Sequence, residues 1–169
     1  FWFVDALARA QGAEFRSHSR YHGEIARVEV EGRELTLLKP QTYMNRSGLS
    51  VRSLVDYMKA PLSEVLVVHD ELDLPPGVAR LKLGGGHGGH NGLRDTITHC
   101  GADFWRLRLG IGHPGDRDQV IDYVLQRPAS ADEEAIIASL GASFDALAIF
   151  VRDGSEKAMK HLHTKESDQ

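Results

Sequence analysis

The chain has 169 residues, 41% of them hydrophobic and 26% charged, a composition ordinary for one folded globular domain. This excludes collagen, low-complexity disorder and disulfide-stapled miniproteins. The single cysteine, Cys100, excludes cysteine-ligated zinc and favours a reducing compartment such as the cytoplasm. The 20 Lys and Arg against 24 Asp and Glu give a net charge of −4, which argues against indiscriminate coating of nucleic acid. Because the longest apolar runs are far shorter than a bilayer span, we expect no membrane partner.

The first half of the chain alternates patterns of helix and strand. A polar loop through Arg20 leads into a hairpin whose turn is Glu31-Gly32. The helix that follows has Asn45 or Ser47 available as its cap. The predicted elements are a helix at residues 2–10, strands at 24–30 and 34–38, and a helix at 45–59.

The second half begins with a short, continuous apolar run, Val65 to Val68. Such a run is typical of a strand covered on both faces, so we expect it at the centre of the sheet. The later elements are strands at 78–83 and 104–111 and helices at 91–100, 119–126, 131–152 and 155–163. Strands interleaved with helices predict a single α/β domain, residues 1–169, with a mixed sheet between helical layers.

The densest cluster of unusual residues is the loop at residues 84–92, which carries six glycines between a predicted strand and a predicted helix. Gly84, Gly86 and Gly89 satisfy the G-x-G-x-x-G pattern of dinucleotide-binding folds. The following strand does not end in the acidic residue that would hold a ribose, so the match is weak. The alternative is that the glycines only allow a tight turn from strand into helix.

Asp70 stands at the carboxyl end of the expected central strand, where open α/β sheets place their ligand sites. A carboxylate there can accept the N–H of an imidazole and orient it as a general base. The alternative is that Asp70 closes a turn in the segment 69–73.

Asn45 and Asn91 each stand at the start of a predicted helix, where an isolated asparagine is a good cap. Two such residues near sheet ends can also bind one substrate. His87 and His90 flank the central glycines, but their spacing lacks the i, i+4 geometry of a helical zinc motif and fixes no third ligand. We therefore expect no metal site.

Alternation along two strands places basic side chains on one face of each. Arg80 and Lys82 share a face of the strand at 78–83, and Arg106 and Arg108 share a face of the next strand. If the two strands are neighbours, these side chains form a compact patch that can grip one or two phosphates. The alternative is a solvated strand face with no ligand.

Four segments of the sequence resemble the signature segments of bacterial-type peptidyl-tRNA hydrolases, in the same order along the chain. They are residues 40–48 (PQTYMNRSG), 68–77 (VHDELDLPPG), 83–92 (LGGGHGGHNG) and 106–114 (RLRLGIGHP). The resemblance implies that family's fold, a mixed twisted sheet sandwiched between helices. It also implies hydrolysis of the ester bond between peptide and tRNA, which recycles tRNA from aborted translation without a metal or cofactor.

The resemblance further implies roles for individual residues. Asp70 matches the aspartate that orients a water-activating histidine, and Asn45 and Asn91 match asparagines associated with the scissile ester. Lys82 and Arg108 match the cations that clamp a tRNA phosphate. The residues expected to bind the peptide and the terminal nucleotide are Tyr43, Met44, Asn45, His90 and Asn91.

In the resembling family the catalytic histidine lies a few residues before the position of Phe1, on a segment that also supplies the first strand. We therefore expect that segment to precede Phe1, because His18 and His22 do not resemble the catalytic motif. The expected partner is peptidyl-tRNA, bound by a monomer in the cytoplasm. Two other functions stay open: a noncatalytic RNA-binding relative with the same fold, and a dinucleotide-binding oxidoreductase.

Overall fold

The computed structural model describes residues 2–41, 46–112 and 130–167. Within it the chain forms two compact units. The first comprises Phe1–Val67 and Leu83–Trp105, and the second comprises Val68–Lys82 and Arg106–Gln169. The single domain expected from the sequence stays a prediction, and so does the helix at 119–126, which lies outside the described residues.

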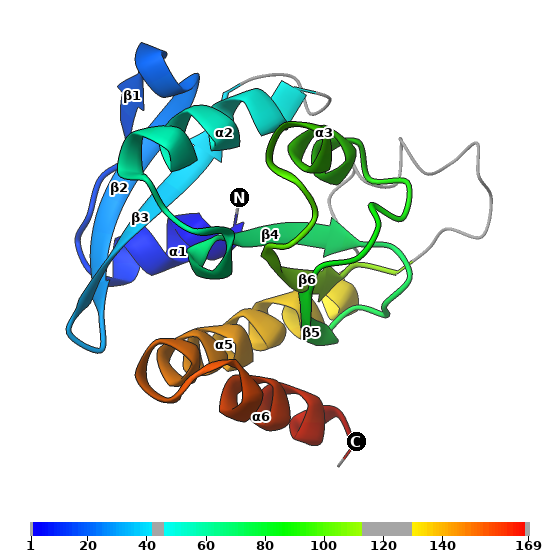
Figure 1. The fold of residues 1–169 in the computed structure, drawn as a ribbon. Coiled ribbons are helices and arrows are strands. Elements are labelled where there is room, and N and C mark those ends of the chain that lie inside the picture. Colours follow the sequence, from blue (N-terminus) through cyan, green and yellow to red (C-terminus); the bar gives the residue numbers. More distant parts are fainter. Residues whose placement is uncertain (1, 42–45, 113–129, 168–169) are drawn as a thin grey trace. The chain divides into compact units, whose positions relative to one another are not determined.

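The first unit combines a small sheet with three α-helices. Its elements are α1 (Trp2–Ala10), β1 (Arg16–His18), η1 (Ser19–Tyr21), β2 (Gly23–Val30), β3 (Arg33–Pro40), α2 (Ser47–Met58), η3 (Leu62–Glu64) and α3 (Asn91–Cys100) (Figure 1). The three strands pair antiparallel in the order β1-β2-β3.

The β2–β3 hairpin confirms the prediction from the sequence. Val30 pairs with Arg33, so the turn consists of Glu31 and Gly32, whose φ angles are 51° and 78°. Positive φ at both central residues matches the twist of the flanking strands, which is why a glycine is favoured there. The segment 16–21, predicted as loop, instead forms β1 and η1. All three side chains of β1 are exposed, so it carries no alternating pattern that the sequence could reveal.

Helices cover the hairpin in this unit. Phe3 and Leu7 of α1 are buried, and α1 packs on β2 and β3. A separate cluster joins Leu54 of α2 to Tyr21 and Ile25. Burial of these apolar side chains supplies the main stabilisation of the unit.

The second sheet contains β4 (Leu66–Glu71), β5 (Ala79–Leu83) and β6 (Trp105–Gly110) in the order β4-β6-β5. The N–H groups of Trp105 and Ile111 donate to the carbonyls of Val65 and Glu71, a constant offset that makes β4 and β6 parallel. On the other side of β6, the N–H groups of Gly84 and Gly110 donate to the carbonyls of Phe104 and Val78, which makes β5 and β6 antiparallel. This sheet is therefore mixed, as predicted, although the described strands divide between two sheets rather than one.

The prediction that residues 65–68 form the central strand is wrong for the described strands. β6 lies in the middle and β4 at the edge, and Leu66, Val67 and Val68 are only half-buried. β6 has the alternating sequence WRLRLG, yet all its side chains except that of Arg108 are buried. Arg106 is 2% exposed. Because charged residues interrupt the apolar run of β6, its sequence does not show the continuous apolar pattern expected of a central strand.

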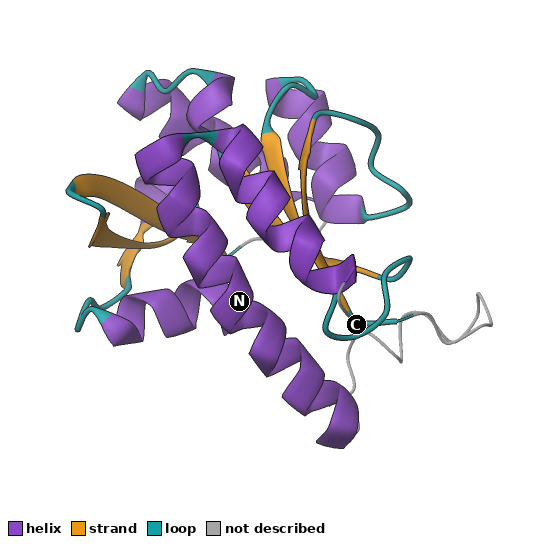
Figure 2. Cartoon of the chain, turned by 90° about the horizontal axis from the view of Figure 1, so that it is seen from below, coloured by secondary structure: helices purple, strands orange, loops and turns teal. Residues whose placement is uncertain are grey.

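Two long helices complete the second unit: α5 (Ser130–Asp153) and α6 (Ser155–Ser167). They pack against each other (Figure 1 and Figure 2) and are joined by Gly154, whose φ is 99°. Among the described residues one helical stretch, Glu133–Asp153, is long and apolar enough to cross a bilayer, with a mean hydropathy of 1.7. Ile136, Leu140 and Ala146 of that stretch are buried, although only 28% of its apolar window is buried within the protein, and a single helix of this kind is weak evidence for a membrane span.

Candidate functional site

Asp70 is an exposed residue near the carboxyl end of β4. Its neighbour His69 is buried and donates its Nδ1–H to the Asp70 carbonyl at 2.9 Å. Because side chains alternate along a strand, Asp70 projects from the face opposite to that of His69 and Glu71. The carboxylate is thus presented to solvent, where it can accept an N–H from a catalytic imidazole.

The sequence left open whether the two basic strands are neighbours, and in the structure β5 and β6 are adjacent. The hydrogen bonds that flank their pairing place Arg108 opposite Arg80, with Lys82 two residues further along β5. Lys82 is exposed, and the side chain of Arg108 is 24% exposed. These positions allow both cations to approach an anion.

Arg106 does not join that patch, contrary to the expectation from strand alternation. It is almost fully buried, and desolvation by burial lowers the pKa of its guanidinium. The pattern of the sequence identified the face of β6 correctly but not how deeply the middle of that face is covered.

Sequence reasoning also missed a carboxylate beside Arg108. Glu71 Oε1 lies 3.4 Å from Arg108 Nη2, and Glu71 Oε2 lies 3.9 Å from His69 Nδ1. Glu71 was one of three acidic residues in the segment 69–73, and only the pairing of β4 with β6 reveals that it faces a cation.

His90 and Asn91 stand at the start of α3. The cap is His90, not Asn91: its Nδ1 accepts the N–H of Leu93 at 3.1 Å. Asn91 is the first helical residue and is exposed. Its amide is therefore not used as the helix cap, which leaves the substrate-binding interpretation in place.

The start of α2 is fixed by a residue of α3. The cap position belongs to Arg46, not to Ser47, and it has no side-chain cap bond; the other candidate, Asn45, lies outside the described residues. Instead the N–H of Gly48 donates to Asp95 Oδ2 at 2.7 Å. A Cβ on Gly48 would lie 2.3 Å from the Asp95 carbonyl oxygen, so only glycine permits this approach.

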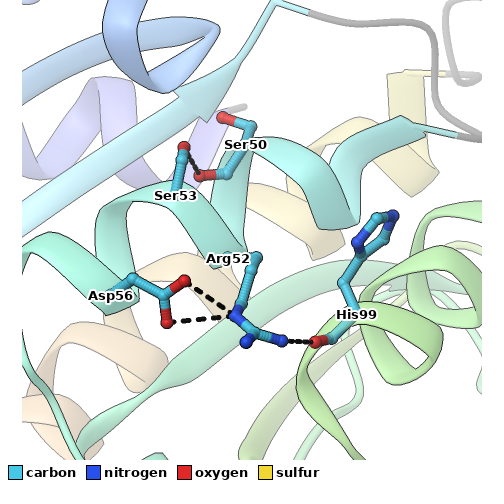
Figure 3. Close-up of polar contacts among 5 residues, drawn as sticks. All are labelled: Ser50, Arg52, Ser53, Asp56 and His99. Carbon is cyan, nitrogen blue, oxygen red and sulfur yellow. Dashed lines mark hydrogen bonds and ion pairs between the residues drawn. The ribbon is translucent and has the colours of Figure 1, made fainter.

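Further contacts between α2 and α3 hold this arrangement. Arg52 Nε donates to both carboxylate oxygens of Asp56, at 2.8 and 3.0 Å, and its Nη1 donates to the His99 carbonyl (Figure 3). The hydrogen bond to Asp56 raises the pKa of Arg52. Since Asp95 lies one helical turn after Asn91, the contacts that fix α2 also set the orientation of the helix that begins at Asn91.

The loop at residues 84–92 needs glycines because several of its residues adopt positive φ angles. Gly84, Gly85, Gly88 and Gly89 all have positive φ, and within the described part of the chain no atom lies within 4 Å of a Cβ built on Gly86, Gly88 or Gly89. The strands before and after α3, β5 and β6, are antiparallel neighbours. A dinucleotide-binding unit needs parallel strands around its glycine loop, so the topology argues against that alternative.

The predicted site residues divide as follows. Asp70, Lys82 and Arg108 belong to the second unit and lie in one sheet, whereas His90 and Asn91 belong to the first. Tyr43, Met44 and Asn45 lie outside the described residues. In the described ranges no group of three His, Cys, Asp or Glu side chains is arranged to hold a metal ion.

The whole chain, residues 1–169, matches the family model for peptidyl-tRNA hydrolase. The peptidyl-tRNA hydrolase of Ruthia magnifica is 46% identical over 98% of this chain and 87% of its own length. The enzyme of that name from Marinobacter nauticus is 50% identical over 96% of this chain and 83% of its own length.

The crystal structure of peptidyl-tRNA hydrolase from Acinetobacter baumannii is similar to this fold, with a TM-score of 0.92 and 41% sequence identity. The match covers 96% of this chain and 83% of that one. The α/β fold class inferred from the sequence is thereby confirmed. The likeness extends over essentially the whole chain in both sequence and structure, and the chain belongs to the peptidyl-tRNA hydrolase family.

Proposed function

We propose that this protein hydrolyses the ester that joins a peptide to the terminal ribose of tRNA. The observation that carries the proposal is the match to the peptidyl-tRNA hydrolase family over residues 1–169. The exposed carboxylate of Asp70 at a strand end and the cations of the same sheet supply chemistry that this reaction needs.

In the proposed reaction a histidine takes a proton from water as the water oxygen attacks the ester carbonyl. Asp70 accepts the other N–H of this histidine, which holds the correct tautomer. The C–O bond to the ribose then breaks, and the ribose oxygen takes up the proton. The products are a peptide carboxylic acid, which loses its remaining proton to solvent and becomes a carboxylate, and a tRNA with a free terminal hydroxyl.

Binding is assigned to two groups of residues. Asn45 and Asn91 hydrogen-bond near the ester, and Tyr43, Met44 and His90 contact the peptide and the terminal nucleotide. Because His90 Nδ1 accepts the Leu93 N–H, a neutral His90 carries its proton on Nε2 and offers it as a donor. The phosphate is captured by Lys82 and Arg108, whose charges provide affinity that falls with salt.

We further propose that the protein acts as a monomer in the cytoplasm, where translation produces the substrate, and that it needs neither metal nor cofactor. The water is activated by the histidine, so no Lewis acid enters the proposed steps.

The direct test is release of tRNA from an N-blocked aminoacyl-tRNA by the full-length protein, with and without EDTA. We expect catalytic release that EDTA does not change. Binding of the tRNA without release would support a noncatalytic RNA-binding relative, and loss of activity with EDTA would overturn the metal-free mechanism.

A further inference from the structure

Glu71 is a carboxylate that the proposed reaction does not use, although it lies between two basic side chains. Its Oε1 is 3.4 Å from Arg108 Nη2 and its Oε2 is 3.9 Å from His69 Nδ1. The side chain is 16% exposed, so its charge is only partly screened by water. Glu71 and Arg108 come from β4 and β6, which are hydrogen-bonded neighbours.

The ion pair with Glu71 restrains the Arg108 side chain but uses only part of its guanidinium group. A guanidinium has five N–H donors in a fixed plane, and Glu71 lies at salt-bridge distance from one of its nitrogens. Among the described residues Glu71 is the one ion-pair partner of Arg108, so further donors can reach a phosphate. Since Arg108 is already held, it loses less conformational freedom when a phosphate binds.

The same contact weakens the attraction of Arg108 for anions, because a negative charge stands beside the guanidinium. Lys82 differs in this respect: in the described part of the chain no carboxylate lies within salt-bridge distance of it. The two cations of the patch are therefore unequal. Arg108 lies beside a carboxylate, and Lys82 is exposed with no carboxylate beside it among the described residues.

We propose that Glu71 is a positioning and specificity-determining residue of the phosphate site. It orients Arg108 and offsets its charge, so that Arg108 binds a phosphate only where Lys82 binds it too. A lone phosphate along an RNA backbone is then held weakly, and a phosphate presented to both cations is selected. The inference rests on the proposed role of Lys82 and Arg108 in binding tRNA.

The test is a double-mutant cycle on binding of deacylated tRNA, measured across a range of salt concentrations in the full-length protein. Glu71→Gln keeps an oxygen that can accept from Arg108 but removes the charge. We expect it to tighten binding at low salt on the order of threefold to tenfold and to steepen the salt slope by about one. In an Arg108→Ala background the same substitution should change neither quantity.

Two further variants separate this role from a general effect of charge or stability. Glu64→Gln removes the same charge from an exposed residue of η3 and should leave the salt slope unchanged. Glu71→Asp keeps the charge but shortens the reach to Arg108, and it should bind no more tightly than wild type. A thermal melt of each variant establishes that it is folded.

The proposal is overturned if Glu71→Gln leaves affinity and slope unchanged, or if its effect is the same with and without Arg108. It is also overturned if Arg108→Ala does not weaken tRNA binding. The cycle measures only tRNA binding. A protein that binds tRNA but does not release the peptide would contradict the proposed hydrolysis, and the cycle would still test the role of Glu71.

Discussion

Lys39 is a partly buried cation whose partners are visible in the structure but not in the sequence. Its Nζ lies 2.7 Å from Asp5 Oδ1 and 3.3 Å from Glu24 Oε2, and 4.3 Å from the centre of the Phe15 ring. The hydrogen bond to Asp5 is the largest cause that raises the pKa of Lys39. These partners come from α1, the following loop and β2, so no local pattern could have brought them together.

The raised pKa of Lys39 predicts how stability depends on pH. The pKa of Lys39 is higher in the folded than in the unfolded protein, so the charged ammonium stabilises the fold. This stabilisation is fully present below the unfolded pKa of about 10.4 and is lost as the pH rises through the folded pKa. We expect Lys39→Met to lower the free energy of unfolding by about 1 kcal/mol at pH 7, since Asp5 is itself partly exposed. That difference should shrink above the unfolded pKa.

Urea unfolding at pH 7 and at high pH measures this effect. Lys157→Met is the matched control, because Lys157 is exposed on α6 and its replacement should change stability little at either pH. An equal loss of stability for Lys39→Met at both pH values would show that the ammonium charge is not responsible.

At the scale of elements, the sequence predicted most helices and strands of the described residues. The hairpin follows from its turn signal, and α1 and α3 form at the predicted residues, although His90 rather than Asn91 caps α3. The prediction of β4 as the central strand is wrong, because a run of branched residues does not require burial on both faces. The central strand is β6, whose apolar pattern is interrupted by the buried Arg106. Tertiary packing decides which strand is central, and only the pairing reveals it.

Two helical glycines should respond in opposite ways to replacement by alanine, because Gly48 lies at the close contact of α2 with α3 and Gly141 does not. Gly48→Ala should destabilise the protein by about 1–3 kcal/mol, since the added Cβ would collide with the backbone of Asp95. Gly141→Ala on α5 should stabilise it by about 0.5–1 kcal/mol, because nothing among the described residues lies within 4 Å of that Cβ and alanine is a better helix former.

Thermal melts of the two glycine variants check these opposite signs. If Gly48→Ala melted at the wild-type temperature, the helices would not be held as closely as the structure indicates, and the role of Asp95 in fixing the start of α2 would need revision.

At the scale of the whole molecule, the sequence was enough to infer the α/β class and the family, because four motifs between residues 40 and 114 follow the order of the family. The division into two compact units was not, since no composition shift or linker marks it. Of the candidate site, Asp70 lies near the carboxyl end of its strand and Lys82 is exposed on its strand, while their roles stay predictions. Glu71 and Asp95 were missed because their roles depend on partners from other elements.

The central claim is that Asp70 orients the group that activates water. The most direct measurement compares turnover of an N-blocked aminoacyl-tRNA by full-length wild type, Asp70→Asn and the control Asp73→Asn, whose aspartate is exposed in the turn after β4. We predict that Asp70→Asn lowers kcat by about 100-fold to 10,000-fold while the Kd for deacylated tRNA and the activity of the control stay near wild type. Near-normal turnover by Asp70→Asn, with tRNA binding intact, would contradict the account.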